Sequence, residues 1–464
     1  MNLTLNYEGL LAPQKQHAVD LLNSLHLNGV AFDSSQTGCG KTYVAAWIAK
    51  NFNAPVVVIC PKVVKKTWDT VLSVFGIKAH LVINYEKITR GNTAHYTYTK
   101  TEYDKSKYWW ESKGINVNFP DNALVIVDEV HKAKGLNSLN SELITAIKNA
   151  GMNLLMLSAT AATNVTEMKS FGFVTNLHNG DQFRNWTLTN GVTYNKYGAM
   201  VWDNSMAECQ VGLKNIHNSL VNVMTVSSRM TRDMFGSIFP DNRISADSFD
   251  LGANTAKLQA VYNNMDAELN ALDTRSKSYK EHHFAILMKA RRHSELLKIP
   301  TMVDWIADMF DEGISPVVFF NFDDTRAAIE NRLSKLKKFD GFIARVVGGQ
   351  SEKQRNQDIE DFQCDKKRVL LVNTAAGNSG LSAHDLNGKF PRHTLINPNW
   401  SAIMTVQALG RCHRANGKSQ VIQRFLFAAD TVEERMRQKV QTRIHNIDLL
   451  NDGDLSYEVD LYNK

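Results

Sequence analysis

A glycine-rich segment between an apolar run and a helical run constrains this fold more than any other feature. It reads SSQTGCGKT from Ser34 to Thr42, and the helical pattern YVAAWIAKNF begins after it. Glycines let backbone N–H groups approach phosphate oxygens closely, and the N-terminus of the next helix favours an anion. A lysine here reaches the β- and γ-phosphates and a threonine hydroxyl binds Mg²⁺, although Ser35 stands where the general pattern has glycine. We therefore predict a site for a nucleoside triphosphate with Mg²⁺, held by Thr37, Gly38, Cys39, Gly40, Lys41 and Thr42.

Short apolar runs rich in β-branched residues alternate with amphipathic stretches in both halves of the chain. This alternation is typical of a parallel sheet covered by helices, so the predicted fold class is α/β. The predicted strands are Gly29 to Phe32, Pro55 to Cys60, Ala123 to Val127, Asn153 to Leu157, Pro316 to Phe320, Val369 to Asn373, His393 to Ile396 and Val421 to Phe427. Because 464 residues exceed what one hydrophobic core supports, we expect more than one domain.

Two carboxylates follow one of the predicted strands. The run ALVIV leads directly into Asp128-Glu129-Val130-His131. A strand that delivers acidic residues beside a phosphate loop suits Asp128 for binding Mg²⁺ and Glu129 for polarising the attacking water. An acidic turn in solvent is the alternative, and the glycine-rich segment upstream disfavours it.

Composition and charge permit several partners and exclude some settings. The chain is 43% hydrophobic and 22% charged, with a formal net charge of +6, which allows a polyanionic partner without requiring one. No apolar run approaches the length of a membrane span, and the first residues lack the pattern of a secretory signal. Five scattered cysteines without a C-x-x-C pair favour a reducing setting. We expect an intracellular protein of the cytoplasm or nucleoid, a viral one included, with no membrane partner.

Cys39 carries a separate hypothesis. It lies among backbone N–H donors at a predicted helix N-terminus, a setting that favours the thiolate. Alkylation of Cys39 is therefore expected to abolish ATPase activity, with bound nucleotide protecting it.

The order of QTGCGKT, DEVH, SAT and QALGRCHR resembles the superfamily-two helicases and translocases over most of the chain. The stretch VVICPKVVKKTW, the box DEVHKAKG and the segment from Trp400 to Arg414 resemble the Swi/Snf-like branch of that superfamily. A shorter stretch, His293 to Trp305, resembles annealing helicases. The fifth motif departs from the family pattern, because Gly377 to Ser382 lacks one glycine and the terminal asparagine.

The resemblance implies two RecA-like lobes in tandem with helical insertions and an ATP site in the cleft between the lobes. Lobe 1 is expected at 1–250, with insertions near 88–121 and 171–250, followed by a helical connector at 251–300 and lobe 2 at 301–464. Trp109 and Trp110 in the first insertion either stack on bases or wedge a duplex junction, or they pack against their own lobe.

The resemblance also implies roles for individual residues. Gln14 reads adenine, with Gln16 as the alternative, and Gly380 completes the nucleotide contacts. The catalytic residues implied are Lys41, Asp128, Glu129, Gln407, Arg411 and Arg414. The coupling residues implied are His131, Ser158 and Thr160. The candidates for nucleic-acid contacts are Lys62, Lys65, Lys66, Thr374, Arg291 and Arg292, although Arg291 and Arg292 are equally compatible with an ordinary solvated surface.

The function expected from this resemblance is a nucleic-acid-stimulated ATPase that moves along DNA. Its DNA is double-stranded, forked or single-stranded, and the reaction remodels branched or partly melted DNA by fork regression, branch migration or annealing. The alternatives are an RNA helicase, a nucleotide-gated nucleic-acid clamp, and the motor subunit of a larger assembly rather than a monomeric motor.

Overall fold

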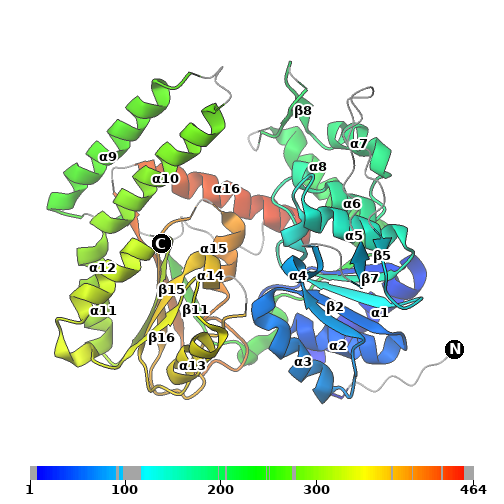
Figure 1. The fold of residues 1–464 in the computed structure, drawn as a ribbon, viewed down its shortest axis with the longest axis horizontal. Coiled ribbons are helices and arrows are strands. Elements are labelled where there is room, and N and C mark those ends of the chain that lie inside the picture. Colours follow the sequence, from blue (N-terminus) through cyan, green and yellow to red (C-terminus); the bar gives the residue numbers. More distant parts are fainter. Residues whose placement is uncertain are drawn as a thin grey trace. The chain divides into compact units, whose positions relative to one another are not determined.

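The computed structural model describes residues 8–89, 94–97, 116–196, 198–203, 206–246, 248–249, 251–273, 278–377, 380–399, 401–429 and 432–453. These residues form two compact units, each with a parallel sheet and covering helices (Figure 1). Unit 1 comprises the described residues up to Gly236 and those from His445 onward, and unit 2 comprises those between Ser237 and Ile444.

The sheet of unit 1 has the strand order β10-β1-β7-β6-β2-β3, and all its pairings are parallel. Its strands are β1 (Val30–Asp33), β2 (Val56–Cys60), β3 (Leu81–Asn84), β6 (Leu124–Asp128), β7 (Asn153–Leu157) and β10 (Ser227–Ser228). The helices of its first half are α1 (Ala12–Asn28), α2 (Lys41–Phe52), α3 (Lys65–Val74), α4 (Tyr85–Thr89) and α5 (Leu139–Asn149). The strands β1 and β2 are buried along their whole length, as expected of a parallel sheet with both faces covered.

The register of the three central strands brings their carboxyl ends level. Asp33 at the end of β1 and Asp128 at the end of β6 are both paired with Leu157, the last residue of β7. The segments that follow these strands therefore leave the sheet from one edge, where ligands bind in open α/β sheets.

The predicted irregular segment 171–250 contains more regular structure than expected. It holds α6 (Lys169–Val174), α7 (Phe183–Thr189), α8 (Ala207–Asn218) and an antiparallel pair, β8 (Thr193–Tyr194) with β9 (Met200–Val201). Close packing explains why apolar periodicity is weak here, since a Cβ on Gly212 would meet the backbone of Asn190.

The predicted insertion at 88–121 is described only in part. Its described residues include an antiparallel pair, β4 (Tyr96–Thr97) with β5 (Asn116–Val117). Trp109 and Trp110 lie outside the described residues.

The sheet of unit 2 has the strand order β11-β17-β16-β13-β15-β14, again all parallel. Its strands are β11 (Asn242–Ser245), β13 (Ser315–Phe320), β14 (Ile343–Val346), β15 (Val369–Asn373), β16 (Arg392–Ile396) and β17 (Val421–Phe425), and a separate pair joins β12 (Ser248–Phe249) to β18 (Phe427–Ala428). The shared α/β class and the two parallel-sheet lobes confirm the fold expected from the sequence. The boundary expected at residue 250 falls inside unit 2, because β11 pairs with β17.

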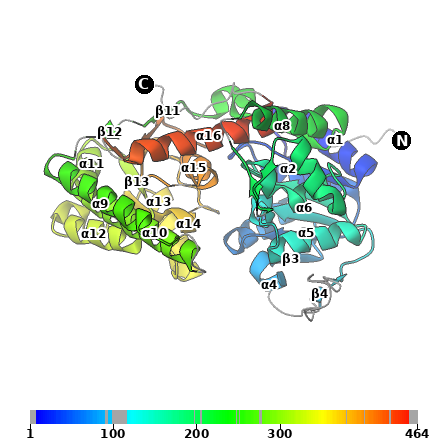
Figure 2. The ribbon, with the colours of Figure 1, turned by 90° about the horizontal axis from the view of Figure 1, so that it is seen from above.

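Helices of unit 2 cover this sheet and form a projecting hairpin. The helices are α9 (Ala253–Asn270), α10 (Tyr279–Leu297), α11 (Ile299–Asp311), α12 (Asp323–Leu333), α13 (Glu352–Gln363), α14 (Thr374–Gly377), α15 (Ala402–Leu409) and the first part of α16 (Val432–Asp452). The single helical pattern predicted from Ala253 to Leu297 is thus two helices, α9 and α10, which lie side by side in Figures 1 and 2.

A buried polar cluster joins this hairpin to α16 within unit 2. The carboxylate of Glu433 accepts hydrogen bonds from Tyr262 Oη at 3.0 Å, from Ser294 Oγ and from Lys298 Nζ at 2.5 Å. The side chains of Lys298 and Glu433 are only 3% and 2% exposed. Burial of both charges makes each of them dependent on the other.

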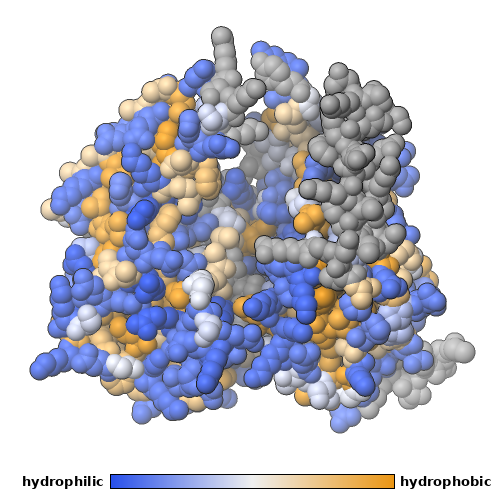
Figure 3. Space-filling view, viewed as in Figure 1, coloured by the Kyte–Doolittle hydropathy of each residue, from blue (hydrophilic) through white to orange (hydrophobic). Residues whose placement is uncertain are grey.

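The surface is mixed in character. On the face drawn in Figure 3, hydrophilic side chains predominate over both units, with apolar side chains between them, as on most globular proteins. No helix in the described part of the chain has the length and apolar character needed to cross a membrane.

Loss of the buried carboxylate should be costly for stability. We expect Glu433→Gln to lower the free energy of unfolding by roughly 3–5 kcal/mol, because Lys298 is left charged and buried without its partner. Urea denaturation followed by circular dichroism measures this loss. The control is Glu268→Gln, which breaks the exposed pair with Lys289 and should cost less than about 1 kcal/mol. Equal losses for the two variants would contradict this account of the cluster.

Candidate functional site

The glycine-rich segment forms the predicted loop between β1 and α2. Its backbone turns through left-handed conformations at Gly38 (φ 91°) and Gly40 (φ 83°), which glycine adopts without strain. A Cβ on Gly40 would also collide with the amide of Gln14. Lys41 and Thr42 open α2, and their side chains are half-buried. The free N–H groups of the first turn make this end of α2 suitable for a phosphate.

Lys41 is held by the loop itself. Its Nζ donates to the carbonyl oxygens of Ser35 at 2.7 Å and Gln36 at 3.1 Å. These are weak, neutral acceptors for a cation, so a triphosphate would compete well for this ammonium group.

The structure distinguishes between the two candidate glutamines in α1. Gln14 is buried, and its Nε2 donates to the carbonyl of Cys39 in the loop at 2.9 Å, while its Oε1 accepts from Leu11 N. Gln16 is exposed and bonds to Asp20 on its own helix. Gln14 therefore contacts the loop and Gln16 does not.

Behind the loop lies a buried pair of side chains, His17 and Asp33, which the sequence analysis did not identify. His17 Nε2 lies 3.2 Å from Asp33 Oδ1, and both side chains are nearly inaccessible. Burial alone would raise the pKa of Asp33, but His17, Lys41 and Ser35 together hold it below its ordinary value. The charge of Asp33 is thus retained under the loop. No sequence spacing marks this pair, because its members are on different elements.

Asp128 and Glu129 occupy the end of β6. Asp128 Oδ2 accepts from Trp68 Nε1 at 3.0 Å, and the Asp128 carbonyl accepts from Tyr85 Oη at 2.7 Å. Burial, and then the charge of Glu129, raise the pKa of Asp128 to about 7. Glu129 has a left-handed backbone (φ 57°, ψ 52°), a strained conformation for a residue with a Cβ and one that is frequent at functional sites.

The three predicted coupling residues form a chain of contacts with Glu129. His131 Nδ1 lies 3.2 Å from Glu129 Oε2 and 3.2 Å from Ser158 Oγ. Ser158 Oγ in turn accepts from the backbone N–H of Thr160 at 3.1 Å. The segment after β6 and the segment after β7 are therefore connected at the same sheet edge.

The candidates in unit 2 gather around another loop. Arg414 donates to Ser382 Oγ at 2.8 Å and to the Leu381 carbonyl at 2.9 Å, next to Gly380. Arg411 is buried, with its Nη1 3.4 Å from the same carbonyl, and Gln407 is buried on α15. That these side chains act on the nucleotide at Lys41 stays a prediction.

The candidates for nucleic-acid contacts differ in exposure. Three lysines are exposed after β2: Lys62, Lys65 and Lys66. Thr374 is buried and its hydroxyl donates to the Phe320 carbonyl at 3.0 Å, so a phosphate contact would require it to leave that acceptor. Arg291 lies half-buried over the Phe322 ring, whereas Arg292 is exposed and paired with Asp324. Only part of this set is thus accessible as it stands.

Two arginines that contact the loop were not identified from the sequence. Arg229 donates to the Ser34 carbonyl, and Arg232 Nη2 donates to Thr37 Oγ1 at 2.7 Å. They lie in the segment interpreted as irregular, where no pattern distinguishes them from ordinary surface arginines.

The hypothesis of a reactive Cys39 thiolate is wrong. The side chain is 1% exposed, and burial raises its pKa to about 11 despite the nearby Lys41 and Arg232. Loss of solvation therefore outweighs the favourable field of the helix terminus at this thiol.

Alkylation should accordingly spare Cys39. We expect iodoacetamide at pH 8 to modify exposed Cys364 in the folded protein at least about tenfold faster than Cys39, which is both inaccessible and protonated. Peptide mass spectrometry over a time course measures the two rates. Comparable rates would show that the loop opens far more readily than its contacts imply.

Asp128 should make stability depend on pH. Its pKa is about 7 in the folded protein against an ordinary 3.8, so the native state binds the extra proton and stability falls as pH rises through this window. Asp128→Asn, which cannot ionise, should therefore be more stable than the wild type above pH 3.8, and its advantage should grow by about 2 kcal/mol or more between pH 5 and pH 8 without divalent cations. Thermal melting at both pH values tests this, and an advantage that is equal at both would contradict it.

Family models match both halves of the chain. One described as the type III restriction enzyme, res subunit, matches residues 10–163, and one described as the C-terminal domain on Strawberry notch homologue matches residues 323–461. The chain also matches a solved structure, the Sulfolobus solfataricus SWI2/SNF2 ATPase core in complex with double-stranded DNA. The match covers 98% of this chain and 96% of that chain, at 17% sequence identity and a TM-score of 0.36.

Known relatives match over very different lengths. A protein of Acanthamoeba polyphaga mimivirus, bearing the name of an ATP-dependent RNA helicase, is 28% identical over 463 residues, 95% of this chain and 83% of that protein. The helicase-like transcription factor of Homo sapiens is 31% identical over 110 residues, 23% of this chain and 10% of its own length. The Arabidopsis thaliana DNA repair protein RAD5B is 35% identical over 107 residues, which are 23% of this chain and 7% of that protein. With its motifs, the two family models and the mimivirus relative make the chain an ATP-hydrolysing helicase that is similar to the Swi/Snf-like branch of superfamily two.

Proposed function

We propose that this helicase is a DNA translocase that remodels branched or partly melted DNA, by fork regression, branch migration or annealing, in replication, recombination or repair. The observation that carries the proposal is the contact chain from Glu129 through His131 to Ser158, because it ties a hydrolytic carboxylate to a second loop at the same sheet edge. Relatives named for DNA repair support DNA as the polymer.

In this proposal the loop binds the phosphates of ATP, and the carboxylates bind the metal and activate water. ATP binds with its phosphates at the N-terminus of α2, and Lys41 exchanges its carbonyl acceptors for phosphate oxygens. Gln14 stands beside the loop to read the adenine. Glu129 orients the attacking water and polarises it, and His131 holds Glu129 in place.

The acidic residues fit a magnesium ion. Burial and the charge of Glu129 raise the pKa of Asp128, and a divalent cation would favour its ionised form. No group of three or more possible metal-ligating side chains occurs among the described residues. In this proposal Asp128, Thr42 and the phosphates would hold the ion together. When bound, the ion neutralises charge on the phosphates.

Unit 2 supplies the remaining positive charge in this proposal. Arg411 and Arg414 approach the γ-phosphate when ATP is bound, and arginines in this position contribute roughly 10³- to 10⁵-fold in rate. Gly380 and Gln407 position the loop and helix that carry them. ATP thereby favours one arrangement of the lobes, and phosphate release favours another.

The polymer is gripped mainly through its phosphates. Lys62, Lys65 and Lys66 are exposed at the carboxyl end of β2, so they present their ammonium groups on the same sheet edge as the nucleotide loop. Arg292 is available once it leaves Asp324, which is an exposed and therefore weak pair. Binding should weaken steeply as salt increases.

RNA is the second candidate polymer. The mimivirus relative that matches nearly the whole chain bears the name of an RNA helicase, which favours RNA in the same site. The two candidates share their ATP chemistry and differ in which polymer stimulates it.

A titration of ATPase activity separates these candidates. We expect duplex or forked DNA to stimulate turnover of the wild type at least about tenfold more than RNA, since the lobes track the DNA backbone. Phosphate release is measured with single-stranded, duplex, forked and four-way DNA and with RNA. Stimulation by RNA alone would refute the DNA proposal.

The control for this titration is Glu129→Gln. Its turnover should fall by about 10² or more while nucleotide binding survives, because only the group that polarises water is lost. A nucleotide-gated clamp without productive hydrolysis predicts instead that the variant and the wild type behave alike.

A further inference from the structure

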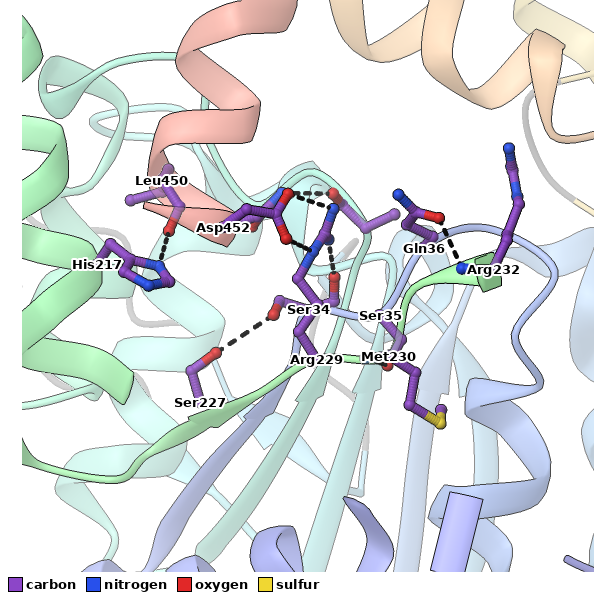
Figure 4. A network of polar contacts seen from close by, with 12 residues as sticks. Ser34, Ser35, Gln36, His217, Ser227, Arg229, Met230, Arg232, Leu450 and Asp452 are labelled. Carbon is purple, nitrogen blue, oxygen red and sulfur yellow. Dashed lines mark hydrogen bonds and ion pairs between the residues drawn. The ribbon is translucent and has the colours of Figure 1, made fainter. Parts of the chain in front are cut away.

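The last turns of α16 contact the nucleotide loop of unit 1 through one arginine. Arg229 makes two parallel contacts with Asp452, Nε to Oδ1 at 2.5 Å and Nη2 to Oδ2 at 2.9 Å, and its Nη1 donates to the carbonyl of Ser34 (Figure 4). The side chains of Arg229 and Asp452 are 10% and 8% exposed. A two-point, largely buried ion pair fixes the direction of the guanidinium as well as its position.

The segment that carries Arg229 runs along the loop. Gln36 N donates to the Met230 carbonyl at 3.0 Å, and Met230 N donates to Ser35 Oγ at 2.9 Å. Arg232 N then donates to Gln36 Oε1 at 3.0 Å, as Figure 4 shows. Residues 34–37 of the loop are therefore held by residues 229–232, and Asp452 holds the first of these.

Arg232 adds a cation at the phosphate end of this contact. Its guanidinium donates to Thr37 Oγ1 at 2.7 Å and to the Thr37 carbonyl at 3.2 Å. Both of these acceptors are neutral, so the guanidinium brings positive charge to the loop, where it favours a bound anion.

The same turns of α16 also contact the coupling segment. Asn451 Nδ2 donates to the carbonyl of Ala159, and Asn446 Nδ2 donates to the carbonyl of Thr163, each at 3.0 Å. Both asparagines are only 4% exposed. One helix end therefore reaches the nucleotide loop through Asp452 and the loop containing Ser158 through Asn451.

We propose that residues 445–453 form a clamp that positions two loops of unit 1 for ATP hydrolysis. Asp452 sets the nucleotide loop through Arg229, and Asn451 sets the coupling segment through Ala159. These are positioning residues, since they act through Arg229 and through the Ala159 carbonyl. The inference rests on the nucleotide site proposed above and adds to it a segment from the far end of the sequence.

The two arms of the clamp should affect different kinetic constants. A loosened nucleotide loop binds ATP less well, so changes at Asp452 should raise KM with a smaller effect on kcat. A loosened coupling segment leaves ATP binding intact, so Asn451→Ala should lower the stimulated kcat with KM little changed. A residue that only stabilises the fold would produce neither pattern in the folded protein.

Asp452→Asn in the full chain tests the first arm. The change keeps the size of the side chain, and a cavity of about 690 Å³ lies beside the pair, so little repacking is required. We expect the Kd of a fluorescent ATP analogue to rise about tenfold, within the range seen for coupled contacts. Arg229→Lys keeps the charge without the two-point geometry and should give an intermediate rise.

The matched control is Asp311→Asn, which breaks the exposed pair with Lys338 in unit 2 and should leave the Kd unchanged. Thermal melting of every variant confirms that the protein is folded at the assay temperature. A wild type that fails to bind the analogue, or that binds it no better than Lys41→Ala, refutes the nucleotide site itself. Binding by Asp452→Asn and Arg229→Lys equal to a binding-competent wild type overturns the clamp alone.

Discussion

Parallel pairing of three strands in unit 1 is the constraint on which the rest of the site depends. Asp33 and Asp128 are level with Leu157 in the sheet, so β1, β6 and β7 end at one edge. The nucleotide loop, the acidic pair and the coupling segment each follow one of these strands. A shift of one residue in any pairing would turn a whole strand to the wrong face and separate these segments.

The charges at this edge are arranged for an anion and a cation together. In the described part of the chain Lys41 Nζ donates to two carbonyl oxygens, while burial and then the charge of Glu129 raise the pKa of Asp128. Asp33 retains its negative charge behind the loop because of His17, and this charge partly balances that of Lys41. A magnesium-bound triphosphate would satisfy both groups at once, which is a physical reason for this site to prefer that complex over either component.

The central strands of both sheets could be predicted from the sequence, and the edge strands could not. Every predicted strand overlaps a strand of the structure, and the strands missed in the two six-stranded sheets, β3, β10, β11 and β14, are the edges of those sheets. Central strands are buried on both faces and read as continuous apolar runs, as in β2 and β6. The edge strand β11, in contrast, is half-exposed, and its sequence NRIS lacks such a run.

The same distinction applies to the site. Residues that belong to a local motif, such as Lys41 and Asp128, can be recognised from the spacing of that motif in the sequence. His17 and Arg229 act through partners far away in the chain and carry no such signal. Cys39 was misjudged for a related reason, because burial of a thiol depends on tertiary packing that a local sequence cannot report.

A crystal structure with Mg²⁺ and a non-hydrolysable ATP analogue tests the central claim most directly. The account predicts phosphates at the N-terminus of α2, Lys41 Nζ moved from the Ser35 carbonyl to a phosphate oxygen, and Arg411 or Arg414 within hydrogen-bond distance of the γ-phosphate. A nucleotide bound elsewhere, or a loop-bound nucleotide with both arginines far from it in every lobe arrangement, would contradict the account.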